Sequence, residues 1–246
     1  MEPTEERQLT RNSIDLFILR FDLVLGNEID FDKLLADISR HFDRTEKRVQ
    51  TNFQVNFASD KSAVNKVESF DYVLTKEKER YSMTFSKLQN GFWFETTNYI
   101  NKETYSNVVK ELLNSAKKND INISTRRIGM RFINNFNCNS PKQFSKIFIS
   151  EISKSLSQRL NQKSISRVIS QDEFNFDVCK VRVQYGIPNK FYPAVINNYD
   201  LLLDIDSFDD SIQELENLSE TINYLNHCAY KAFVSYINPN YLDNLK

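Results

Sequence analysis

The segment RVQTNFQVNF, residues 48–57, alternates polar and apolar side chains without a break. Such period-two alternation is typical of a β-strand in an antiparallel sheet that has one packed face and one wet face. A strand must pair with other strands, so this pattern constrains the fold more strongly than composition does. The side expected to pack comprises Val49, Thr51, Phe53, Val55 and Phe57.

The hydrophobic pattern predicts six further strands, over 13–25, 72–86, 91–100, 125–136, 173–188 and 199–208. It predicts helices over 30–42, 102–118, 139–160 and 209–237, where apolar residues recur at helical spacing. Asp30 and Ser140 suit the N-cap positions of the first and third helices, and Ser207 with Asp210 suits a capping box for the last one. The chain is therefore expected to be an α+β protein with a largely antiparallel sheet covered by helices and a long C-terminal helix.

Two local signals refine the expected strands. Asn90 and Gly91 stand between two strand patterns, and this pair favours a type I′ hairpin turn, in which both central residues have positive φ. In 173–188 the apolar phase changes near Cys179, which predicts a β-bulge there.

The order of these elements suggests that a strands-then-helix unit occurs twice, first over 48–118 and then over 173–237. We expect a flexible N-terminus at 1–12, a first α+β half at 13–160 and a second at 161–246, packed as one compact unit. The polar stretch 161–172 is the expected boundary between the halves.

Composition argues against several classes of function. A general nucleic-acid or anionic-membrane binder carries a net positive charge, whereas the net charge of this chain is −1. Three cysteines, odd in number and far apart, fit buried free thiols better than a disulfide framework or a zinc site, which favours a reducing, cytoplasmic location. No run has the length and apolarity of a membrane span. Only four glycines argue against phosphate-cradling loops, so no cofactor is expected.

The strand TRRIGMRFINNF, residues 125–136, is unusually basic. Alternation puts Ile128, Met130 and Phe132 on one face and Arg127, Gly129 and Arg131 on the other. The two arginines would lie roughly 13–14 Å apart, with a glycine gap between them. Either they form a site for an anion such as a nucleotide or phosphate, which guanidinium groups bind bidentately, or they are engaged in internal ion pairs.

An acidic segment provides candidate partners for these arginines. Eight acidic residues and no basic ones occur from Asp200 to Glu220, and Asp204 and Asp206 share one face of a predicted strand. These two carboxylates either pair with the arginines or hold a divalent cation, but no calcium-loop motif supports a metal, and none is expected. The candidate ligand-binding residues are Arg127, Gly129, Arg131, Asp204 and Asp206.

The region 142–190 is basic, with nine Lys or Arg against four acidic residues. It offers a surface for nucleic acid or for an acidic protein, although no aromatic residues alternate with the charges as stacking platforms. No catalytic motif is present: His227 and Cys228 are adjacent on a predicted helix and so diverge by about 100°. We therefore expect no catalytic residues and a non-enzymatic role.

The core Arg127-Ile128-Gly129-Met130-Arg131-Phe132-Ile133-Asn134 resembles the R-I-G-[LM]-R-[YF]-[IV]-N motif of a sporadically distributed, functionally uncharacterised family of bacterial and archaeal proteins of about 250 residues. An early Ile18 to Phe21, a later Leu202-Leu203-Asp204-Ile205-Asp206, and Leu225-Asn226-His227 with Phe233 resemble its other motifs. The resemblance spans roughly 14–238, and the spacing of His227 departs from the family pattern. It implies no activity, and the patchy distribution suits mobile or defence-associated genes.

The first hypothesis is a cytoplasmic binding or regulatory protein that recognises a protein partner, in a toxin–antitoxin or phage-defence setting, and that self-associates. The second is a sensor of an anionic small ligand, bound by Arg127 and Arg131. The third is a nucleic-acid-binding protein that uses 142–190.

Overall fold

The computed structural model describes residues 13–24, 30–58, 61–161, 164–214 and 216–245, with the backbone alone for 31, 52–58 and 61–67. The strands in this part of the chain form one antiparallel sheet, in the order β2-β3-β4-β5-β1-β6-β9-β8-β7, and a short β10 pairs with β6. Their bounds are β1 Ile14–Leu23, β2 Arg44–Ala58, β3 Lys61–Lys76, β4 Tyr81–Ser86, β5 Gly91–Thr96, β6 Ser124–Phe136, β7 Val168–Asn175, β8 Lys180–Ile187, β9 Leu201–Asp209 and β10 Gln213–Glu214.

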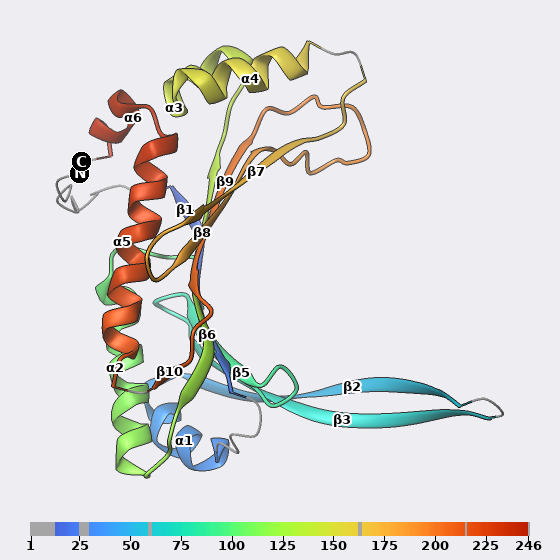
Figure 1. Cartoon of the computed structure of the whole chain (residues 1–246), viewed down its shortest axis with the longest axis vertical. Helices are drawn as coiled ribbons and strands as arrows, with labels where there is room; N and C mark the ends of the chain where they lie inside the picture. The colour runs from blue at the N-terminus through green and yellow to red at the C-terminus, as the bar shows by residue number, and fades with distance from the viewer. Residues whose placement is uncertain (1–12, 25–29, 59–60, 162–163, 215, 246) are drawn as a thin grey trace.

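The longer helices cover one face of this sheet (Figure 1). None of the described helices is both long and apolar enough to cross a membrane. The α+β class, the antiparallel sheet and the C-terminal helix are confirmed. The helices are α1 Phe31–Ile38, η1 Ser39–His41, α2 Glu103–Lys118, η2 Pro141–Gln143, α3 Phe144–Ile147, α4 Ser150–Leu160, α5 Leu218–Tyr236 and α6 Pro239–Asp243.

The core lies between the helices and the inner face of the sheet. At its centre, β1 contributes Phe17, Leu19 and Phe21, and β6 contributes Met130 and Phe132, all of them buried. Rings from separate elements meet there: the centroids of Phe17 and Phe132 are 4.9 Å apart. Burial of large aromatic side chains supplies much of the free energy that holds such a core together.

Apart from β2, which lies beyond β3, equal numbers of strands flank the central β1–β6 pair in the described sheet. From β1 outward lie β5, β4 and β3, and from β6 outward lie β9, β8 and β7. Each set belongs to a run of strand, helix, strands and helix, one over 14–118 and the other over 124–236. Each run thus begins a strand and a helical segment before the unit that the sequence pattern suggested, and one continuous sheet joins the expected halves 13–160 and 161–246.

Two predicted strands are in fact hairpins. The segment 72–86 turns at Glu77–Arg80, where Arg80 has φ 56°, so that β3 ends at Lys76 and β4 begins at Tyr81. In 173–188 the chain turns between Asn175 and Lys180, and β7 and β8 pair with each other. The change of phase near Cys179 therefore marks a turn, and the predicted bulge is wrong.

The turn at Asn90 is also different from the prediction. Asn90 has φ 47°, but Gly91 is a regular strand residue, so a four-residue turn from Lys87 to Asn90 replaces the type I′ turn. Glycine is needed at 91 for another reason. A Cβ there would lie 2.5 Å from the carbonyl oxygen of Phe21, because β1 passes very close.

Helix boundaries depart from the prediction at two sites. The segment 139–160 is broken at Phe148, which makes a β-bridge with Ile237, and the Ser140 side chain caps nothing. The last helix begins at Leu218 instead of 209, because Ser207 belongs to β9 and Asp209 accepts hydrogen bonds from the turn that follows. The predicted capping box is therefore wrong, whereas Asp30 does cap α1, accepting from the Lys33 N–H at 3.1 Å.

Strands β2 and β3 project from the sheet as a two-stranded arm (Figure 1). We define the arm as residues 49–58 and 61–70, which lie beyond the last β3–β4 pair, Asp71 with Ser86. Val49, expected to pack, is 60% exposed, and Thr51 is exposed as well. Among the described residues, no third strand pairs with the arm, and Val49 on its predicted apolar side is exposed. The side chains of Phe53, Val55 and Phe57 lie outside the described part.

Candidate functional site

The candidate site occupies the face of the sheet that the long helices leave uncovered, which we call the open face. The sheet curves strongly, and the open face is its concave side (Figure 1). Strand register places charged residues across it. One row runs Trp93, Arg20, Gly129, Phe208 and Lys180, on β5, β1, β6, β9 and β8 in turn.

A set of charged side chains and one ring form the centre of this face, and we call it the open-face cluster. Four of the strands that supply it lie next to one another in the sheet, namely β1, β6, β9 and β8. Its members are Arg20, Asp22, Arg127, Arg131, Glu173, Lys180, Arg182, Asp204, Asp206, Phe208 and Asp210.

Arg131 and Asp204 form a bidentate ion pair. The Nε and Nη2 groups of Arg131 donate to the two carboxylate oxygens of Asp204 at 2.9 and 2.6 Å. The Asp204 side chain is 7% exposed, whereas that of Arg131 is 46% exposed. The hydrogen bonds that Arg131 donates to Asp204 raise the pKa of Arg131, against the opposing effect of partial burial. The pair fixes the arginine while one side of its guanidinium still faces water.

Arg127 is surrounded by carboxylates. Its Nη2 donates to Asp206 at 3.1 Å, and further nitrogens lie 3.6 Å from Asp210 and 4.0 Å from Asp22. Its guanidinium also stacks on the ring of Phe208, 4.6 Å from the centroid. The charge of Arg127 is thus shared among three acids and an aromatic face.

Gly129 does not leave an empty gap. A Cβ on Gly129 would meet the guanidinium of Arg127 at 3.5 Å, an ordinary contact distance. The side chain of Arg127 therefore lies over the glycine and fills the space that a ligand would have used. The five candidate residues do come together, but as ion pairs internal to the chain.

Asp206 is a carboxylate of the cluster whose charged form is disfavoured by burial. Burial raises its pKa, and this effect outweighs the opposing attraction of Arg127, Arg131 and Arg182. A carboxylate in this state is more easily protonated than an ordinary aspartate. The arginines reduce the cost of burying its charge without removing it.

The sequence pattern did not identify several residues of the open-face cluster. Arg20 donates to Asp22 at 2.7 Å and lies 5.4 Å from the ring of Trp93, while Phe208 is covered by cations although it belongs to the polar face. The alternation of β1 could have indicated that Arg20 and Asp22 share a face. Their place beside β6 could not be found, because the pairing of β1 with β6 joins segments about a hundred residues apart.

The cluster has chemical limits. It holds five cationic and five acidic side chains, so it is close to neutral. Within the described residues no group of three or more His, Cys, Asp or Glu side chains is placed to hold a metal ion. The three cysteines are free and buried, as expected. Burial raises the pKa of Cys138 to about 11, which does not suit a nucleophile.

The basic region 142–190 is divided in the structure. Lys180 pairs with Asp210, Arg182 with Glu173 and Lys190 with Asp200. Other basic residues of this region lie on η2, α3, α4 and the loop before β7, and Lys163 is outside the described residues. The region therefore forms no continuous row of free cations in the part of the chain that is described.

Comparison with known proteins gives no match: no family model, no curated protein and no solved structure is significantly similar to this chain.

Proposed function

We propose that this chain is a non-enzymatic binding or regulatory protein that recognises a protein partner on the open face of its sheet. The observation that carries the proposal is the concave, uncovered open face with its internally paired charges. Charges held in fixed positions by their own partners suit the recognition of a complementary surface, since little side-chain ordering remains to be done on binding.

The same observation favours a protein over the other two candidates. An anionic small ligand would need free guanidinium groups, whereas Arg127 and Arg131 are engaged by aspartates. A nucleic acid would need a net positive surface, and the cluster is near neutral. The arm projects on the concave side of the sheet (Figure 1), where its backbone adds a flank to a partner surface.

The family resemblance is part of this proposal. Its Arg127–Asn134 and Leu202–Asp206 motifs contain four of the charged residues of the open-face cluster. A motif that carries the charges of one surface fits a shared recognition surface. The toxin–antitoxin or phage-defence setting and the cytoplasmic location stay predictions that rest on the sequence.

The test is a charge exchange on the open face. Glu173 and Arg182 form an exposed pair at 3.0 Å, so the double variant Glu173→Arg/Arg182→Glu keeps an ion pair while it reverses the surface pattern. Tagged wild type is used to isolate a stoichiometric partner from the native host, and the purified partner is then titrated with both proteins. We expect a loss of about tenfold or more in affinity for the exchanged variant.

The control is Lys154→Glu, on the exposed side of α4, which should bind as the wild type does. Size-exclusion chromatography of the wild type shows whether the partner is a second copy of the chain. Equal affinity of the exchanged variant and the wild type, with both folded, would refute recognition through the open face.

A further inference from the structure

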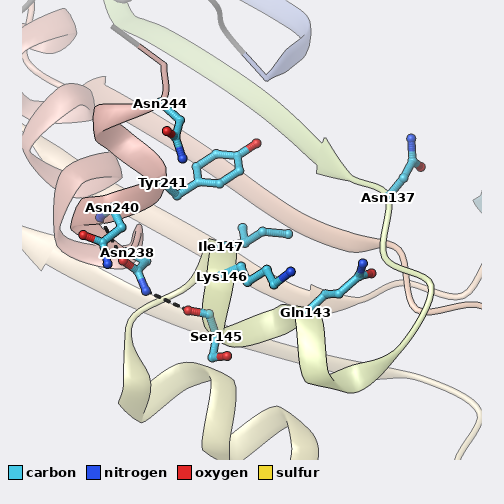
Figure 2. Close-up of a pocket in the computed structure, with 9 residues that line it drawn as sticks. All are labelled: Asn137, Gln143, Ser145, Lys146, Ile147, Asn238, Asn240, Tyr241 and Asn244. Carbon is cyan, nitrogen blue, oxygen red and sulfur yellow. Dashed lines mark hydrogen bonds between the residues drawn. The ribbon is translucent and has the colours of Figure 1, made fainter.

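A second hollow lies apart from the open face, between the end of β6, α3 and α6, and has a volume of about 470 Å³ (Figure 2). No residue of the open-face cluster lines it. Its lining is rich in side-chain amides, and we call it the amide pocket. The lining includes Asn137, Gln143, Lys146, Asn240, Tyr241 and Asn244.

The walls of the pocket are fixed to each other. Asn238 caps α6 by accepting from the Asn240 N–H at 2.9 Å, and its amide nitrogen donates to the Ser145 carbonyl at 2.7 Å, as Figure 2 shows. The Asn238 N–H also donates to the Ile147 carbonyl at 2.8 Å. These bonds hold α6 against α3, so the pocket exists before any ligand arrives.

The polar groups of the lining are largely unused. Among the described residues, no hydrogen bond or ion pair engages the side chains of Asn137, Asn240, Asn244 or Lys146. Gln143 uses its oxygen to accept from the Asn139 N–H at 2.6 Å, which leaves its amide nitrogen as a donor. The pocket therefore offers several donors and acceptors and one positive charge.

The chemistry of the lining narrows the class of ligand. No lining residue is acidic, which does not suit a divalent cation. A single lysine and no arginine suit one negative charge better than a di- or triphosphate. Side-chain amides donate and accept at once, and a peptide group does the same. The buried Ile147 and the ring of Tyr241 add apolar surface for a small side chain.

We propose that the amide pocket binds the carboxyl end of a peptide chain. Lys146 pairs with the terminal carboxylate, and the amides of Gln143, Asn240 and Asn244 bond to the peptide groups that precede it. Pockets of this volume hold ligands of a few residues. The chain end is either the tail of a protein or a free short peptide, since both carry the same terminal chemistry. This proposal is independent of the open face, and its failure would leave the proposed function untouched.

The test compares N-acetyl-trialanine that has a free carboxylate with its terminal carboxamide, by titration of the folded chain followed by NMR or calorimetry. We expect a dissociation constant at or below about 1 mM for the acid and about tenfold weaker binding for the amide. Lys146→Gln should remove this preference, and Asn244→Ala should weaken both ligands alike. Lys142→Gln, an exposed residue outside the pocket, is the matched control and should change neither.

Unacetylated trialanine distinguishes the two sources. Tighter binding of the acetylated acid assigns the pocket to protein tails, and tighter binding of the free-amine peptide assigns it to short peptides; both support the proposal. It is overturned if the acid does not bind at about 10 mM, if acid and amide bind equally, or if Lys146→Gln retains the preference while the protein is folded.

Discussion

Removal of Arg131 should lower the free energy of unfolding more than removal of the Asp204 charge does, because Asp204 is the more deeply buried partner. Arg131→Met removes two charge-assisted hydrogen bonds, at 2.9 and 2.6 Å, from a carboxylate that is only 7% exposed. A buried charge left without its partner costs several kcal/mol, but Arg131 is 46% exposed, so water can enter in its place. We expect a loss of about 2 kcal/mol in the free energy of unfolding.

The converse change should be milder. Asp204→Asn keeps an acceptor for Arg131, and the half-exposed guanidinium can be hydrated, so about 1 kcal/mol is expected. The double variant should lose less than the sum of the two, by about 1 kcal/mol. Urea unfolding followed by the fluorescence of Trp93, the single tryptophan, measures all three. Arg126→Met, an exposed residue of the same strand, is the control and should lie within about 0.5 kcal/mol of the wild type.

If Arg131→Met is no more destabilising than Arg126→Met, the ion pair does not contribute the expected free energy. If the two single losses simply add, Arg131 and Asp204 are energetically independent despite their contact. Either result contradicts the prediction.

Three further predictions concern the same sheet. Gly91→Ala should cost about 2 kcal/mol in unfolding free energy because its Cβ would meet backbone at 2.5 Å, whereas Gly129→Ala meets only a flexible guanidinium at 3.5 Å and should cost far less; equal losses would contradict this. Because the folded-state pKa of Asp206 is raised, its contribution is full below the unfolded-state pKa and is lost as pH rises through the folded-state value. Asp206→Asn should therefore gain stability relative to the wild type as the pH rises above about 4 in chemical denaturation, and a difference that does not change with pH would refute it. Tyr236→Phe removes a 2.5 Å hydrogen bond that the Tyr236 hydroxyl donates to Asp172. Because Asp172 is exposed and can be hydrated, thermal unfolding should show a loss of about 1 kcal/mol in the free energy of unfolding. A loss several times larger would contradict this.

The alternation of polar and apolar residues correctly predicted which side chains face the core in a strand that has one buried face. In β6 it placed Ile128, Met130 and Phe132 in the core and Arg127 and Arg131 on the other side, and all five are found there. The pairing of the arginines with Asp204 and Asp206 was foreseen as one of two alternatives, because opposite charges on strand faces attract whenever the strands are neighbours.

Sequence pattern failed where a turn or a pairing partner decides the structure. Nothing local separates a bulge near Cys179 from a hairpin, since both change the phase of the apolar residues. Ile212 has helical spacing with later apolar residues, yet it is 67% exposed, because β9 runs on to Asp209 and delays the last helix. The packing expected at Val49 is wrong because, among the described residues, β4 pairs with β3 only as far as Asp71 and leaves Val49 exposed. The length of a neighbouring strand cannot be seen in the pattern of β2 itself.

The two central strands, β1 and β6, have similar sequences where they pair with each other. Leu19-Arg20-Phe21 and Met130-Arg131-Phe132 are similar triplets, and Leu19 lies directly opposite Met130 in the antiparallel register. A two-fold axis through the Leu19–Met130 pair is consistent with this register, in which Arg20 faces Gly129 and Arg131 faces Ile18. Such an axis places Arg20 and Arg131 at equivalent positions on its two sides. Arg20 forms an ion pair with Asp22, and Arg131 forms one with Asp204. Under the proposed function, a partner that binds the middle of the open face would contact both runs, through Arg20 and Asp22 of the first and Arg131 and Asp204 of the second.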